Sequence, residues 1–225
     1  MKQITTKDIR DDGIKEHLVH INSEFADGFE FLKKYPRSVS IFGSARTKPG
    51  EENYEYAEEL GKKIATDLNY AVITGGGPGI MEAANKGAYE AHGVSLGLNV
   101  SLPHEWMTNA YVTHSIKFSY FFVRKTMLTF AAEAYVFFPG GFGTFDELCG
   151  ILTLIQTEKI PHVPIILFNS KFWDPYKKFL EVYLLDMDHA ISTVDMKLFE
   201  ITDSADRAIE IIRKASVSDW WRNIN

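Results

Sequence analysis

Apolar residues follow two patterns along this chain: short continuous runs, and longer stretches in which they recur every three or four positions. Short segments, several of them continuous apolar runs, predict strands at 39–42, 70–74, 94–99, 111–118, 134–138, 164–168 and 198–201. The spaced stretches predict helices at 53–68, 80–91, 120–132, 145–157, 175–185 and 204–214. Strands that alternate with helices in this way indicate a parallel sheet with helices on both faces. We therefore predict an α/β fold built on a doubly wound, mostly parallel sheet.

The first 37 residues differ from this pattern because they hold one apolar stripe at three- and four-residue steps. The stripe consists of Ile14, Leu18, Ile21, Phe25, Phe29 and Leu32. An amphipathic helix with such a face must cover either the main domain or a second subunit. No linker or repeat divides the rest of the chain, so we predict a helical extension (1–37), one main domain (38–215) and a C-terminal tail (216–225). Trp220 and Trp221 in the tail predict packing or an oligomer contact.

The composition of the chain limits which binding partners and which cellular compartment we expect. The net charge of −6 gives no basic surface for a nucleic acid polymer. The only cysteine, Cys149, excludes an internal disulfide, and residues 1–10 lack the apolar core of a signal peptide. No apolar run approaches the roughly 18 residues of a membrane span. We expect a cytoplasmic protein with no membrane partner and, since the histidines have no convincing ligand spacing, no metal.

The most informative motif runs from Pro139 to Glu147 with the sequence Pro-Gly-Gly-Phe-Gly-Thr-Phe-Asp-Glu. It lies between a predicted strand and a predicted helix. In that arrangement glycines let the backbone approach an anion closely, and the helix N-terminus adds partial positive charge. The predicted phosphate ligands are Gly140, Gly141, Gly143 and Thr144. The carboxylate of Glu147 follows within the helix, which suggests chemistry on a phosphorylated substrate.

Glu147 has a second interpretation that the spacing alone leaves open. Thr144 and Glu147 have the T-x-x-E pattern of a capping box, in which the two side chains satisfy each other's backbone N–H groups. Such a cap is worth roughly 0.5–2 kcal/mol and needs no ligand. Glu147 is therefore either a functional acid or a helix cap.

An earlier glycine turn, from Gly75 to Gly79, follows another predicted strand. It does not match the dinucleotide-binding fingerprint, because Ile80 stands where that motif needs glycine, and it lacks the lysine of a phosphate-binding Walker loop. An NAD enzyme and an ATPase are therefore disfavoured. Gly76 and Gly77 either contact a ligand or form a tight turn. Ser44, after the first strand, and Glu82, in the first turn of the next helix, are further candidates with the same alternative of a local structural role.

Arg124 and Lys125 stand near the start of a predicted helix, where the helix dipole disfavours cations by a few tenths of a kcal/mol. An anion nearby would justify both residues. The alternative for Arg124 is pairing with a structural carboxylate, and for Lys125 a solvated surface charge.

Taken together, the motifs resemble the LONELY GUY family of cytokinin-activating nucleoside 5′-monophosphate phosphoribohydrolases, and their bacterial relatives, many of them mislabelled lysine decarboxylases. The matching segments are Gly75–Ala83, Arg124-Lys125-x-x-Leu128 and Pro139–Glu147. The resemblance covers roughly residues 38–185 and is specific to the superfamily, but it does not fix the substrate. The run Phe-Gly-Ser-Ala-Arg at 42–46 and the long extension look more like a bacterial branch.

This resemblance implies a Rossmann-like homodimer, or a higher assembly, that cleaves the N-glycosidic bond of a purine nucleoside 5′-monophosphate without a cofactor. Adenine or an N6-substituted adenine leaves, and ribose 5-phosphate remains. Arg124 and Glu147 are the implied catalytic residues, with Glu147 acting as nucleophile or as base. The expected substrate-binding residues are Gly140, Gly141, Gly143, Thr144, Lys125, Gly76, Gly77, Glu82, Ser44 and, from a loosely matching loop, Glu105.

Two other functions remain as alternatives. A carrier protein for a nucleotide or a phosphorylated cofactor needs the phosphate turn but not the pair Arg124 and Glu147. A pyridoxal-phosphate decarboxylase is disfavoured because no lysine has a recognisable Schiff-base context and the domain is small for that chemistry.

Overall fold

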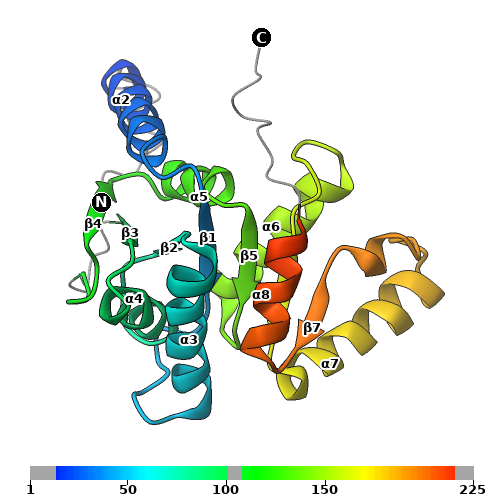
Figure 1. The fold of residues 1–225 in the computed structure, drawn as a ribbon. Helices are drawn as coiled ribbons and strands as arrows, with labels where there is room; N and C mark the ends of the chain where they lie inside the picture. The colour runs from blue at the N-terminus through cyan, green and yellow to red at the C-terminus, as the bar shows by residue number, and fades with distance from the viewer. Residues whose placement is uncertain (1–13, 101–107, 216–225) are drawn as a thin grey trace.

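A computed structural model describes residues 14–100 and 108–215 and contains one seven-stranded parallel sheet (Figure 1). The strand order is β4-β3-β2-β1-β5-β6-β7. The strands are β1 (Ser38–Phe42), β2 (Ala71–Thr74), β3 (Ser95–Val100), β4 (His114–Phe118), β5 (Ala134–Phe137), β6 (Ile165–Phe168) and β7 (Glu200–Thr202). The predicted α/β class and the parallel sheet are confirmed.

The α-helices are α2 (Ile14–Leu32), α3 (Glu52–Lys63), α4 (Ile80–Glu90), α5 (Phe121–Phe130), α6 (Phe142–Gln156), α7 (Ser170–Phe179) and α8 (Ala205–Lys214). Two π-helical segments, η1 (Ile64–Leu68) and η2 (Leu180–Met187), continue α3 and α7, and η3 (Asp195–Lys197) is a short 3-10 turn. Side chains of α3, α4 and α8 pack on one face of the sheet, and those of α5, α6 and α7 on the other. Neighbouring strand residues such as Val136 and Phe137 point to opposite faces, so both layers are apolar and the sheet is doubly wound.

The central strand β1 marks the point where the strand order reverses. It pairs with β2 on one side and with β5 on the other, so Val39 stands level with both Val72 and Ala134. The following strands β3 and β4 extend the sheet in one direction, whereas β6 and β7 extend it in the other. In sheets of this type, ligands bind beyond the carboxyl ends of the strands at the reversal. The ends of β1 and β5 are therefore the place to look for a site.

Two predicted helix boundaries are wrong. The helix predicted at 145–157 begins at Phe142, because its N-cap is Gly141 and the turn itself winds into the helix. The helix predicted at 175–185 begins at Ser170, with Pro175 inside it. Its start is fixed by the Asn169 side chain, which accepts a hydrogen bond from the backbone of Phe172, and by the fully buried Trp173.

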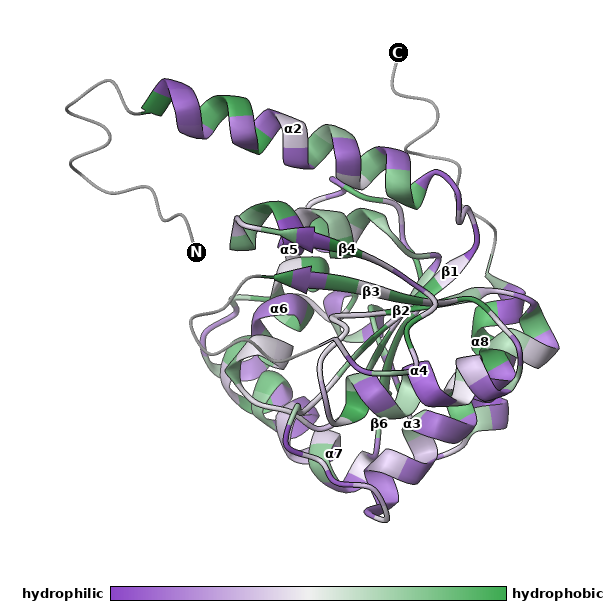
Figure 2. Ribbon diagram, turned by 90° about the vertical axis from the view of Figure 1, so that its left-hand side faces the viewer, coloured by the Kyte–Doolittle hydropathy of each residue, from purple (hydrophilic) through white to green (hydrophobic). Residues whose placement is uncertain are grey.

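The predicted amphipathic helix of the extension is confirmed as α2, which lies over α5 and β4 (Figure 2). It buries Ile21 and Leu32 against the main domain, while Leu18 and Phe29 of the predicted stripe remain 49% and 42% exposed. Within the described ranges no helix is long and apolar enough to cross a bilayer. The predicted tail, with Trp220 and Trp221, lies outside the described residues.

Candidate active site

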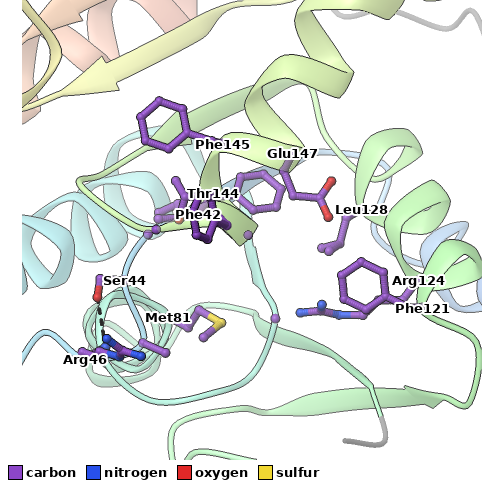
Figure 3. Close-up of a pocket in the computed structure, with 17 residues that line it drawn as sticks. Phe42, Ser44, Arg46, Met81, Phe121, Arg124, Leu128, Thr144, Phe145 and Glu147 are labelled. Atoms are coloured by element: carbon purple, nitrogen blue, oxygen red, sulfur yellow. Dashed lines mark hydrogen bonds between the residues drawn. The ribbon is translucent and has the colours of Figure 1, made fainter. Parts of the chain in front are cut away.

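A cavity of about 680 Å³ opens beyond the carboxyl ends of β1 and β5 (Figure 3). Its size falls within the roughly 300–1,000 Å³ of small-molecule sites. The end of β1, the first glycine turn, α5 and the start of α6 all contribute to its wall. The lining residues are Ile41, Phe42, Gly43, Ser44, Ala45, Arg46, Gly75, Met81, Phe121, Arg124, Leu128, Gly141, Phe142, Gly143, Thr144, Phe145 and Glu147. Segments that are far apart in the sequence therefore meet at one cavity.

The N-terminus of α6 forms an open part of this wall. A Cβ atom added at Gly141 or at Gly143 would meet no protein atom within 4 Å, so internal packing does not require glycine at either position. Both residues are exposed, and both line the cavity. Gly140 differs, because a Cβ there would overlap Oγ1 of Thr144. The two open glycines instead leave the first backbone N–H groups of the helix accessible to an anion.

Glu147 extends from the second turn of α6 into the cavity wall. Only 5% of the residue is exposed, and its Oε2 has no hydrogen-bond partner within the described residues. Burial raises the pKa of this carboxyl group to about 7, although the nearby positive charges of Lys125 and Arg124 lower it. A buried acid without a hydrogen-bond partner is costly and is typical of functional sites.

The capping-box interpretation of Glu147 is wrong. Gly141, not Thr144, is the N-cap of α6, and that cap makes no side-chain hydrogen bond. Thr144 lies inside the first turn, with its side chain against Gly140 and its surface towards the cavity. Of the two interpretations of Glu147, the helix cap is therefore excluded and the functional acid is left.

Arg124 reaches the same cavity from α5, and in Figure 3 Arg124 and Glu147 are drawn at one end, with Ser44 and Arg46 at the other. Its Nε donates to the carbonyl oxygen of Leu98 at 2.7 Å. One terminal nitrogen lies so close to Gly75 that a Cβ atom there would overlap it. Burial lowers the pKa of this guanidinium, and the charge of Glu147 opposes that shift. Arg124 is therefore held in place at the end of the cavity where Glu147 lies.

Lys125 is not among the residues that line the cavity. Its Nζ pairs with Oδ2 of Asp146 at 2.6 Å and donates to the carbonyl oxygen of the same residue at 2.9 Å. The distance from Nζ to Oε2 of Glu147 is 3.9 Å, which is an ion pair but not a hydrogen bond. Lys125 thus ties α5 to the first turns of α6 behind the acid.

The first glycine turn is held by buried hydrogen bonds. Gly76 has φ +73°, its N–H donates to Thr74 Oγ1, and its carbonyl oxygen accepts from the backbone of Asn109. The Asn109 side chain also donates to the carbonyl oxygen of Gly77. Gly76 and Gly77 do not line the cavity, in contrast to Gly75 and Met81. These bonds fit the tight-turn alternative for both glycines.

The remaining predicted substrate-binding residues do not all lie at the cavity. Ser44 lines the cavity, and its Oγ accepts from the backbone N–H of Arg46 at 3.1 Å. Glu82 lies outside the lining and accepts a hydrogen bond from the hydroxyl of Tyr54 at 3.0 Å. Glu105 lies outside the described residues.

Sequence reasoning missed two conspicuous residues of the cavity. Arg46 is exposed there and forms no ion pair within the described part of the chain. Phe142 lines the cavity although 97% of it is exposed. The signal for Arg46 was its place in the loop that follows the central strand β1, and the signal for Phe142 was its place between the glycines of the turn.

Comparison with the sequences of known proteins gives three findings. The family model described as possible lysine decarboxylase matches residues 81–212. A cytokinin riboside 5′-monophosphate phosphoribohydrolase from Rhodococcoides fascians is 25% identical over 65% of this chain and 75% of its own length. The corresponding enzyme LOG from Oryza sativa subsp. japonica is 28% identical over 68% of this chain and 63% of its own length.

A solved structure with the same fold is that of the molybdenum cofactor carrier protein MCP from Chlamydomonas reinhardtii. The two chains superpose with a TM-score of 0.58 at 24% identity, over 80% of this chain and 97% of the other. At that identity the likeness establishes the Rossmann-like fold and nothing about the ligand.

Proposed function

We propose that this chain, which belongs to the LONELY GUY family, hydrolyses the N-glycosidic bond of a purine nucleoside 5′-monophosphate. The products are the free base, adenine or an N6-substituted adenine, and ribose 5-phosphate. The observation that carries this proposal is the buried carboxylate of Glu147, whose Oε2 makes no hydrogen bond with any described residue. It shares a cavity with Arg124 and the open helix N-terminus of α6.

The phosphate is assigned to the N-terminus of α6. Gly141 and Gly143 leave space beside its backbone N–H groups, and Thr144 lines the same part of the cavity. A phosphate gains both hydrogen bonds and dipole attraction at such a terminus. Arg46 adds a positive charge at the cavity wall that no described carboxylate neutralises. A phosphate held there orients the ribose for reaction at a distance from the phosphate itself.

The reaction centre is assigned to Glu147 and Arg124. As the bond from C1′ to the base nitrogen breaks, the sugar develops positive charge that a carboxylate stabilises. Glu147 either bonds to C1′ or removes a proton from the attacking water, and both routes need its ionised form. Water supplies a hydroxyl group to C1′ and a proton to the departing base. Arg124 orients the acid or a ribose hydroxyl, and the charges of Lys125 and Arg124 favour the ionised carboxylate.

A carrier function is supported less well. A carrier needs the phosphate site, but it has no use for a buried acid whose Oε2 lacks a hydrogen-bond partner among the described residues. Such a group costs stability wherever it has no compensating role.

The test is a product assay on purified protein. AMP, isopentenyl-AMP, GMP, CMP and adenosine are incubated with the protein, and bases and sugar phosphates are separated by chromatography. We expect adenine or isopentenyladenine in amounts equal to ribose 5-phosphate, and intact adenosine because it lacks the phosphate. Intact nucleotides throughout contradict the proposal, and tight binding of a nucleotide without turnover favours the carrier.

Gly143→Ala is expected to change stability and binding in opposite directions. Gly143 is the second residue of α6, where alanine is the better helix former by up to about 1 kcal/mol. Its new methyl group meets no protein atom but occupies the space assigned to phosphate. We expect a higher free energy of unfolding in urea and roughly tenfold weaker AMP binding by calorimetry.

Thr153→Ala is the matched control, because Thr153 is an exposed residue of the same helix outside the cavity. It should raise the free energy of unfolding and leave AMP affinity unchanged. Equal AMP affinities for Gly143→Ala and the unmodified chain would show that the phosphate does not bind at the N-terminus of α6.

A further inference from the structure

The N-terminal helix α2 supplies the cap of α5, the helix that carries Arg124. Glu24 of α2 accepts hydrogen bonds from the backbone N–H groups of Ser119, at 2.7 Å, and Tyr120, at 3.2 Å. Tyr120 is the N-cap residue of α5, and its own side chain does not cap the helix. A carboxylate at this place also meets the positive end of the helix dipole. The cap thus comes from an element about 95 residues earlier in the chain.

The two helices also touch at further points, and Figure 2 shows α2 lying over α5. A Cβ atom at Gly28 of α2 would lie 2.6 Å from the sulfur atom of Met127, so a larger residue would force the buried Met127 side chain of α5 to shift. At the other end, Nδ1 of His17 lies 2.6 Å from the hydroxyl oxygen of Tyr120. The sheet on one side and α2 on the other therefore fix the position of α5.

This position matters for the site because Arg124 follows the capped residues by one helical turn. The backbone N–H of Arg124 donates to the carbonyl oxygen of Tyr120 at 3.2 Å, so a shift of Tyr120 moves Arg124 with it. Beyond the backbone, the Arg124 side chain is held by the bond from its Nε to Leu98. A displacement of about 1 Å at a catalytic group costs about 10²-fold in rate.

We propose that α2 positions the active-site arginine and that Glu24 is the positioning residue through which it does so. The inference rests on the proposed hydrolase function, and it assigns a role to the helical extension. Glu24 is not among the residues lining the cavity, so its effect reaches the substrate only through α5.

The first test compares Glu24→Ala with Glu30→Ala. Glu30 is an exposed residue of the same helix that pairs only with Lys33 of the adjoining turn among the described residues. Well below the melting temperature, we expect Glu24→Ala to lower kcat for base release from AMP by about 10- to 100-fold, with KM changed by roughly twofold or less. Glu30→Ala should match the unmodified chain. A Glu24→Ala protein that melts earlier but keeps its kcat would overturn the proposal.

A second test does not depend on activity. Hydrogen exchange of the backbone amides of residues 124–128 is followed by mass spectrometry in the same three proteins. We expect at least roughly tenfold faster exchange in Glu24→Ala and no change in Glu30→Ala. Unchanged protection means that Glu24 does not hold α5. If the unmodified chain leaves every nucleotide intact, the proposed function fails, and the exchange result still decides whether Glu24 holds the helix.

Discussion

Replacing Glu147 with glutamine is expected to lower base release from AMP by about 10³-fold, because a neutral amide neither stabilises the developing sugar cation nor activates water. Gln has nearly the same shape as Glu, so the phosphate contacts stay in place and AMP affinity should change little. The measurement is single-turnover release of adenine, together with calorimetric titration of AMP. Normal turnover in this variant would show that Glu147 takes no part in the reaction.

The same substitution should make the protein more stable at alkaline pH. Burial raises the pKa of Glu147 from 4.5 to about 7, so between these values the folded chain keeps a proton that the unfolded chain has lost. The stability due to this group is therefore fully present below pH 4.5 and is lost as the pH rises through 7. At about 1.4 kcal/mol for each pKa unit, the loss is of order 3 kcal/mol. Glutamine carries no charge, so the variant does not lose this stability as the pH rises.

Urea unfolding at pH 4 and at pH 8 measures this difference directly. We expect the gain of Glu147→Gln over the unmodified chain to be larger at pH 8 than at pH 4. Glu59→Gln, which removes an exposed carboxylate from α3, serves as control and should show no such change. In the unmodified chain kcat should rise with pH around 7, since the ionised acid is the active form. A kcat that falls through this range would instead make Glu147 a proton donor.

The fold was predictable because continuous apolar runs such as 134–138 have few alternatives to a buried parallel strand. Each glycine turn could likewise be placed at a strand end. The start of α6 was not predictable, because Thr144 offered a capping box and nothing local indicated that the helix would begin at Phe142, with Gly141 as its N-cap.

Other parts of the candidate site depend on contacts between distant segments. Lys125 looked like a substrate ligand from its motif, but the packing of α5 on α6 directs it to Asp146. Glu24 gave no signal at all, because its partners at Ser119 and Tyr120 are adjacent to it only in the folded chain. Arg46 was overlooked since no motif argument weighed a lone arginine after a strand. Motif reasoning therefore identifies the groups in the cavity better than the groups that hold them.

Replacing Arg124 should be the other severe change, and two different substitutions separate its charge from its position. Arg124→Lys keeps a positive charge but loses the Nε bond to Leu98, and we expect kcat to fall by about 10²- to 10³-fold. The control is Arg37→Lys, an exposed arginine just before the other end of β1, which should behave like the unmodified chain.

Gly75→Ala tests the position of Arg124 without touching its chemistry. The added methyl group would overlap a terminal nitrogen of Arg124 and lie 2.8 Å from the sulfur atom of Met81, both at the ends of flexible side chains. The backbone therefore stays in place while the guanidinium moves. Since φ at Gly75 is not positive, alanine adds no backbone strain there. We expect kcat for AMP to fall by about 10²-fold with little change in melting temperature. Normal turnover in Gly75→Ala would mean that the arginine works from more than one place, and the fixed geometry proposed for the pair with Glu147 would be wrong.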